Sequence, residues 1–233
     1  MRSVFVLVVA AAVASATLAP NGIFDELVEH TPVEVLPQLV SGKAALGLCP
    51  SEAFLNYYNQ VWETSLGFDG SLTWRNASSL WVQVRRMFKT GDLPTFQKLC
   101  SSRDKFYFNM GQIMYYQCIN IFSLLQYSDD IQNAAIYVRM WQHLDFMCNV
   151  GFEQLLTPGT YGCIVTASGN DGCVNAYQAS VNYTNPCPAV EQYMNCEKQL
   201  FNIACGTPTG YYACEDTRLG YGSYCTNLRC DIY

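Results

Sequence analysis

Apolar residues recur at steps of three and four along the middle of the chain, which is the spacing of one helical face. The clearest of these stripes predicts a helix over about residues 130–149. We expect its buried face to carry the large apolar side chains of the stripe, namely Trp141, Leu144 and Cys148. Arg139 and Gln142 should then point outward.

More helices are predicted before this one. Ser51 is an N-cap residue that opens the first. The expected apolar face of that helix consists of Phe54, Tyr57, Tyr58, Val61 and Trp62. A second helix is expected over residues 78–90, a short third one over 95–100, and a long fourth one over 104–126. The apolar stripe of the fourth consists of Phe106, Met110, Ile113, Met114, Cys118, Ile121 and Phe122.

The C-terminal part contains two predicted helices separated by a glycine. Pro188 suits the first turn of a helix that ends before Gly206, and Thr207-Pro208 starts the next one. An antiparallel helical hairpin about Gly206 follows from this order. Before this hairpin, residues 163–166 could form a strand, although no partner strand is evident. The expected fold is therefore an all-α, disulfide-rich helical domain with an irregular, cysteine-dense C-terminal part.

Cysteines are frequent and well separated along the chain. They are Cys49, Cys100, Cys118, Cys148, Cys163, Cys173, Cys187, Cys196, Cys205, Cys214, Cys225 and Cys230. An even number without Cys-x-x-Cys spacing predicts six disulfides in an oxidising compartment and argues against a zinc site. In the hairpin, Cys196 lies ten residues before Gly206 and Cys214 lies eight after it. These two should come level, so we expect them to form a disulfide.

The first residues have the features of an export signal. Arg2 precedes an apolar run over residues 4–13, and Ala14-Ser15-Ala16 fits a cleavage site. The expected division is a signal peptide at residues 1–16, an acidic leader at 17–48 with a short helix near 23–29, and a single domain at 49–233. The apolar run is shorter than the about 20 residues that span a membrane. We therefore expect a secreted protein with no membrane span.

Charge and modification sites narrow the possible partners. The net charge of −6 argues against nucleic-acid binding. Seven basic residues against two acidic ones fall within residues 75–105, which indicates either a site for an anionic partner or a solvated helix face. Asn76-Ala77-Ser78 and Asn182-Tyr183-Thr184 are sequons, so Asn76 and Asn182 are predicted N-glycosylation sites.

Catalytic and metal-binding patterns are scarce. His143 could serve a hydrolase together with Asp145, but such near neighbours on a helix face different directions. The chain has neither a Gly-x-Ser-x-Gly nor a His-Glu-x-x-His motif. We therefore predict no catalytic residues, no metal and no cofactor. The 14% of aromatic residues could form a packed core or line a pocket for an apolar ligand.

Several cysteines and their flanking residues resemble a known family. The motifs are Cys100-Ser-Ser, Tyr116-Gln-Cys118-Ile-Asn, Leu144-Asp-Phe-Met-Cys148-Asn-Val-Gly151, and Cys196 followed by Ala204-Cys205-Gly206. Together they are similar to the secreted cysteine-rich proteins of nematodes grouped around chondroitin-proteoglycan-type domains, over about residues 49–230. The resemblance implies a mostly helical, exported protein, largely without an assigned activity and with no catalytic residues to carry over. Acidic Ser-Gly sites, which a proteoglycan core would carry, do not occur in the chain.

The sequence thus favours a secreted, non-enzymatic extracellular protein that binds a protein or matrix partner. One alternative is a carrier of an apolar small molecule or lipid in an aromatic-lined pocket. Another is a secreted hydrolase with an unrecognised site.

Overall fold

The computed structural model of the chain describes residues 30–39, 48–90, 92–167, 171–182, 184–222 and 224–231. These residues form helices and loops, with no β-strand among them, which confirms the expected all-α fold. In chain order the elements are α1 (Leu36–Leu39), α2 (Glu52–Leu66), the 3-10 helix η3 (Trp74–Asn76), α3 (Ala77–Thr90), α4 (Leu93–Met110), α5 (Gln112–Cys118), α6 (Ile121–Leu124), α7 (Ile131–Cys148), α8 (Phe152–Leu156), α9 (Thr160–Thr166), α10 (Asp171–Ser180), α11 (Cys187–Cys205) and α12 (Thr207–Tyr221).

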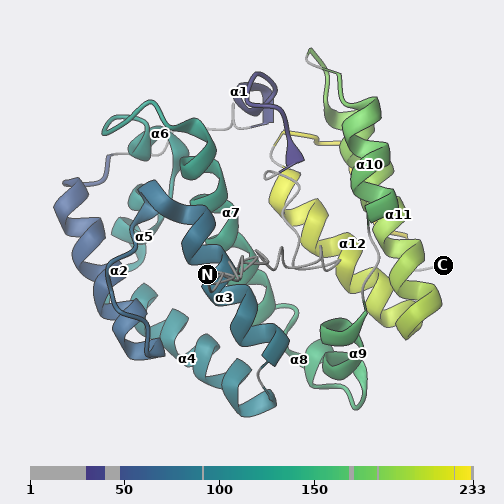
Figure 1. Ribbon diagram of the computed structural model, residues 1–233, viewed down its shortest axis with the longest axis horizontal. Coiled ribbons are helices and arrows are strands. Elements are labelled where there is room, and N and C mark those ends of the chain that lie inside the picture. The colour runs from purple at the N-terminus through teal and green to yellow at the C-terminus, as the bar shows by residue number, and fades with distance from the viewer. Residues whose placement is uncertain are drawn as a thin grey trace, which may run out of the picture.

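Helix α7 lies at the centre of the molecule, with α2, α4, α5 and α6 on one side and α9 to α12 on the other (Figure 1). Helices α3, α4 and α12 all pack against it. Trp141 and Leu144 are fully buried, as expected. Arg139 is also buried, at 4% exposure, so the expectation that it points outward is wrong. A helix enclosed by others on several sides has little outward face on which to place a charge.

Side-chain caps explain where several helices begin. The Ser51 hydroxyl accepts a hydrogen bond from the backbone N–H of Phe54 at 3.1 Å and opens α2, as predicted. Asp92 caps α4 and Asp130 caps α7 in the same way. Each of these oxygens satisfies a backbone N–H group that has no partner within the first helical turn.

Helix α2 buries a face that only partly matches the one expected. Its buried residues are Leu55, Asn59, Trp62, Glu63 and Leu66. Of the predicted face, Trp62 is buried and Phe54 and Tyr58 are partly buried against the core, whereas Tyr57 is 61% exposed and Val61 is 44% exposed, so the prediction was wrong at those two residues. Two polar residues interrupt the true buried stripe and hid it from the pattern. The burial of these two polar side chains is tolerated because Asn59 donates a hydrogen bond to the Glu63 carboxylate.

The chain over residues 93–126 forms α4, α5 and α6, in place of the short helix and long helix expected. Helix α4 continues unbroken to Met110. Gly111 then has a φ of 83°, a conformation that residues with a Cβ atom rarely adopt. Helix α5 therefore does not extend the apolar stripe of α4, and Ile113 is 70% exposed. The expected stripe is buried at Phe106, Met110, Cys118 and Ile121.

Helices α11 and α12 form the predicted hairpin. Pro188 lies in the first turn of α11, and Gly206, with a φ of 89°, joins the two helices. Residues 163–166 belong to α9, so the strand considered there is wrong. The cysteine-dense part combines these helices with non-helical stretches at 181–182, 184–186 and 224–231.

All twelve cysteines are paired in six disulfides. The pairs are Cys49–Cys118, Cys100–Cys148, Cys163–Cys205, Cys173–Cys196, Cys187–Cys225 and Cys214–Cys230. The expected Cys196–Cys214 bond is therefore wrong. Two residues that come level on adjacent helices pair only if their side chains also face each other, and Cys196 faces α10 instead. We call residues 49–148 the aromatic half and residues 163–230 the cystine half.

The described part of the acidic leader packs onto the helices. Val35 and Leu36 are fully buried. The hydroxyl oxygens of Thr31 and Tyr177 lie 2.7 Å apart in a hydrogen bond, which ties this segment to α10. The expected signal peptide, its cleavage site and the helix near residues 23–29 lie outside the described residues.

Candidate functional site

The two halves meet at a buried polar cluster between α7 and α12. His143 Nδ1 lies 2.7 Å from Asp216 Oδ1, and Arg139 Nη2 donates to the backbone oxygen of Asp216 at 2.9 Å. These three side chains are at most 5% exposed. The Trp81 ring stacks on the His143 ring at 5.3 Å, and the Tyr221 ring lies 5.3 Å from the Arg139 guanidinium carbon. Aromatic rings therefore pack against both His143 and Arg139.

The hydrolase alternative gains no support from His143. Its carboxylate partner is Asp216 and not Asp145. A Cβ atom at Gly220 would lie 2.1 Å from the Arg139 guanidinium carbon, so α12 approaches α7 closely at this point. Neither of the surface hollows described below is lined by His143. We therefore assign the cluster a structural role in joining the two halves.

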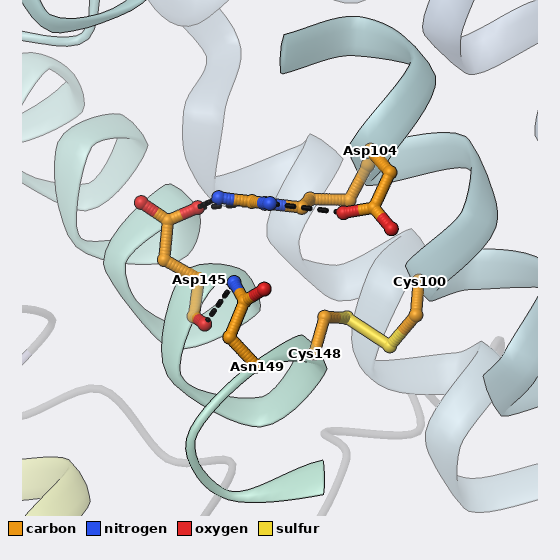
Figure 2. The surroundings of a disulfide bond; sticks show 6 residues. Cys100, Asp104, Asp145, Cys148 and Asn149 are labelled. Carbon is orange, nitrogen blue, oxygen red and sulfur yellow. Dashed lines mark hydrogen bonds and ion pairs between the residues drawn. A yellow bond between two sulfur atoms is a disulfide. The ribbon is translucent and has the colours of Figure 1, made fainter. Parts of the chain in front are cut away.

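A second polar network lies at the surface, beside the disulfide that links α4 to α7 (Figure 2). Arg103 of α4 donates from Nε to Asp145 Oδ1 of α7 at 2.8 Å, and from Nη1 to Asp104 Oδ1 at 2.9 Å. The hydroxyl of Tyr115 donates to the same Asp145 oxygen at 2.7 Å. Figure 2 shows the carboxylates of Asp104 and Asp145 on opposite sides of the guanidinium that both accept from. The Arg103 guanidinium is thereby held in a fixed orientation.

Burial and charge together set the protonation of this network. Burial raises the pKa of Asp145 above its ordinary value, although the Arg103 guanidinium opposes that shift. Burial disfavours the charged form of Arg103, but the Asp145 carboxylate outweighs it and the pKa of Arg103 is raised. Burial, followed by the Asp145 charge, raises the pKa of Tyr115 well above its ordinary value. Arg103 is thus a permanent cation, and Tyr115 is a neutral hydrogen-bond donor.

A hollow of about 330 Å³ lies over this network. We call it the aromatic hollow, and its lining residues are Arg103, Asp104, Tyr107, Phe108, Tyr116 and Asn149. Phe108 is 76% exposed and Tyr116 is 58% exposed. The exposed Ile113 lies one turn before Tyr116 on α5, which extends the apolar surface. Rings of this size are left at the surface although the protein buries all four of its tryptophans.

The floor of the aromatic hollow is firmly supported. The Cys100–Cys148 bond joins α4 and α7 with a Cα–Cα distance of 5.1 Å. Asp104 lies one helical turn after Cys100, and Asp145 one turn before Cys148, so both carboxylates extend from the crosslinked turns. The amide of Asn149 donates to the backbone oxygen of Asp145 at 2.8 Å. The polar groups of the hollow are therefore positioned before any ligand arrives.

A second hollow, of about 260 Å³, lies beside the Cys187–Cys225 bond. Its lining includes Asn185, Glu191, Tyr224, Thr226 and Asn227. A lipid carrier needs an enclosed site with a mostly apolar lining. Neither of these two hollows has such a lining, so they give the carrier alternative no support.

The predictions of no metal site and no membrane span can be compared only with the part of the chain that the structure describes. In that part, no three His, Cys, Asp or Glu side chains are grouped to hold a metal ion. No helix there is long and apolar enough to cross a membrane.

Both predicted glycosylation sites are at the surface. Asn76 is exposed at the end of η3, where its side-chain oxygen accepts from the backbone N–H of Thr73. Asn182 is exposed in the loop after α10, and its side-chain oxygen accepts from both the N–H and the hydroxyl of Thr184, each at 2.8 Å. Glycosylation of both residues stays a prediction.

Three of the seven basic residues over 75–105 are engaged locally. Arg75 is bound to the Glu52 carboxylate at 2.6 Å, and Arg103 is buried in the network described above. The Lys98 amine donates to the backbone oxygen of Leu66 at 3.3 Å. The arrangement therefore favours local pairing over a single site for an anionic partner.

A buried carboxyl group lies on α2 in the aromatic half. Glu63 of α2 is fully buried, and its Oε2 accepts from the backbone N–H of Leu72 at 3.3 Å. Asn59 links it to the hydroxyl of Tyr137, which donates to Asn59 Oδ1 at 2.9 Å. Burial raises the pKa of Glu63 from 4.5 to about 7. The group therefore changes charge near neutral pH.

The sequence interpretation missed the aromatic hollow. The sequence pattern places Arg103 only in the basic stretch over 75–105, and Asp145 only beside His143. Their relation becomes visible once Cys100 is paired with Cys148, because Arg103 lies three residues after the first cysteine and Asp145 three residues before the second. The cysteine pairing was the missing signal.

Comparison of the chain with family models, with curated proteins and with solved structures gives no match. The likeness to nematode cysteine-rich proteins thus stays a prediction.

Proposed function

We propose that this chain is a secreted, non-enzymatic binding protein of the extracellular space, and that the aromatic hollow is its contact surface. Export is supported by six disulfides, since such bonds persist in oxidising compartments. The signal-like first residues and the two surface sequons fit the same location.

The observation that carries the binding role is the exposure of Phe108 and Tyr116 around a fixed arginine. Exposed apolar surface of this kind marks interaction sites. Aromatic residues and arginine are enriched where partners bind, because rigid rings supply contact area at little entropic cost. The carboxylates of Asp104 and Asp145 both accept hydrogen bonds from Arg103. This pairing favours a fixed recognition surface over acid–base chemistry.

The test uses the full chain produced in a eukaryotic secretory host. Wild-type protein should be recovered from the medium and should bind, saturably, to extracellular matrix from the source organism. The double variant Phe108→Ala/Tyr116→Ala should bind about tenfold or more weakly, the loss expected for two aromatic contacts. Tyr57→Ala is the matched control, since Tyr57 is a similarly exposed ring on α2, and should bind like the wild type.

Two outcomes would refute the proposal. One is retention of the chain inside the cell. The other is matrix binding by the double variant that equals that of the wild type. Treatment with an N-glycosidase should also lower the mass of the secreted chain, and the substitutions Asn76→Gln and Asn182→Gln should each remove part of that change.

A further inference from the structure

The rings of the aromatic hollow form an angled wall. Tyr107 lies at its centre, with its ring 5.5 Å from that of Phe108 and 6.4 Å from that of Tyr116, both in edge-to-face geometry. Neighbouring rings therefore present faces in different directions. Phe108 is 76% exposed, so much of its ring is open to a ligand. A ligand that fits this wall must have an apolar face, such as the C–H face of a sugar ring.

The floor of the hollow offers planar polar groups. The bonds from Arg103 to Asp104 and Asp145 use three of its five N–H groups. The Arg103 side chain is 8% exposed, and it lines the hollow. The Asn149 amide is oriented by its bond to the backbone of Asp145, which leaves its oxygen as an acceptor. A guanidinium and an amide fixed in this way match pairs of neighbouring hydroxyl groups.

Charge determines which hydroxyl-rich ligand fits. The lining holds one guanidinium, from Arg103, and one carboxylate, from Asp104, and the guanidinium is also paired with the Asp145 carboxylate. An anionic ligand such as a sulfated chain would find the only lining cation among the described residues already paired with two carboxylates, so it would gain little attraction there. The site therefore suits a ligand without charge.

We infer that the aromatic hollow binds a neutral carbohydrate chain, an inference that rests on the proposed function. Sugar rings stack on Phe108 and Tyr116, and hydroxyl groups bond to Arg103 and Asn149. The volume of about 330 Å³ is at the small end of ligand sites, which suits a short segment of a longer chain. The matrix partner is thus recognised through its glycans.

The direct experiment measures binding of the full chain to oligosaccharides. The probes are neutral oligomers of glucose, mannose, galactose and N-acetylglucosamine, with a heparin oligomer as the anionic comparison. We expect saturable binding of one neutral series and weaker binding of heparin. Phe108→Ala and Asn149→Ala should each weaken binding by about fivefold to tenfold. Tyr57→Ala should leave it unchanged, and all variants should keep the thermal midpoint of the wild type.

A parallel experiment separates this inference from the proposed function. Matrix is treated either with periodate, which cleaves vicinal diols in sugars, or with a protease. We expect hollow-dependent binding to be lost after periodate and kept after protease. Binding that needs Phe108 and Tyr116 but survives periodate and is lost after protease would overturn the carbohydrate inference and leave the proposed function intact. Stronger binding of heparin than of every neutral oligomer would also overturn the carbohydrate inference. Matrix binding that is unchanged when Phe108 and Tyr116 are replaced would overturn both the inference and the proposed function.

Discussion

The aromatic half and the cystine half reach stability by different means. The aromatic half contains all four tryptophans, each at most 2% exposed, and has only two disulfides. The cystine half contains no tryptophan and has the other four disulfides. A large apolar core stabilises the folded state directly, whereas crosslinks act mainly by restricting the unfolded chain. The chain thus combines a large apolar core in one half with dense crosslinking in the other.

The disulfides also divide cleanly between the halves, and none joins one half to the other. The junction depends on packing between α7 and α12, where Arg139 and His143 meet Asp216. Except for Asn149, which directly follows α7, the lining of the proposed binding surface lies in the aromatic half, on helices held by its own core and crosslinks.

The largest expected effect tests the core of the aromatic half. Trp141 is fully buried, with its ring 4.1 Å from that of Phe106 and 4.7 Å from that of Trp62. Trp141→Ala should lower the free energy of unfolding by roughly 4 kcal/mol, because it removes a large apolar side chain and leaves a cavity. Denaturant unfolding with the disulfides intact measures this loss. A change near zero would show that α7 is not the centre of the core, and exposed Tyr57→Ala provides the reference for a small effect.

The next effect tests the junction. Asp216→Ala would leave the Arg139 guanidinium buried without its carboxylate and should cost about 3 kcal/mol. The neighbouring residue offers a control, since Glu215 binds Arg218 near the surface. Glu215→Ala should cost less than about 1 kcal/mol. Equal losses in the two variants would mean that the buried cluster is not what joins the halves.

A smaller effect depends on pH. The pKa of Glu63 is raised by burial to about 7, so the folded protein keeps a proton that the unfolded chain releases from pH 4.5 upward. The free energy of unfolding therefore falls as pH rises from about 4.5 to 7, and the loss is complete above that range. Glu63→Gln removes the charge, so its gain over the wild type should grow by on the order of 2 kcal/mol between pH 5 and pH 8.

Denaturant unfolding of both proteins at the two pH values checks this prediction. Glu52→Gln is the opposite control, because the hydrogen bond from Arg75 lowers the pKa of Glu52. That variant should lose stability at pH 8 relative to the wild type. An equal response of the Glu63 variant and the wild type to pH would contradict the buried carboxyl.

Local signals in the sequence predicted much of the fold. Ser51, Pro188 and Gly206 mark helix ends that depend only on nearby backbone geometry, and the structure agrees at each of them. The direction that a side chain faces depends on distant partners. The pattern therefore misplaced Arg139, whose partner Asp216 is 77 residues away, and paired Cys196 with the wrong cysteine.

The same limit explains why the aromatic hollow could not be predicted. Its residues come from α4, α5 and the end of α7, and they meet only because Gly111 interrupts the expected long helix. As one helix over residues 104–126, the chain would have placed Ile113 in the core stripe. The break turns that apolar surface outward, and periodicity alone does not show where a helix breaks.

The most direct test of the account uses a protease site inserted at Pro158, an exposed residue between Cys148 and Cys163. After cleavage, the two fragments should remain associated in native buffer, because α7 and α12 hold them together by packing. Denaturation without any reducing agent should then separate them into two species, each with its own disulfides intact. Fragments that separate only after reduction would show a disulfide between the halves and would contradict the account.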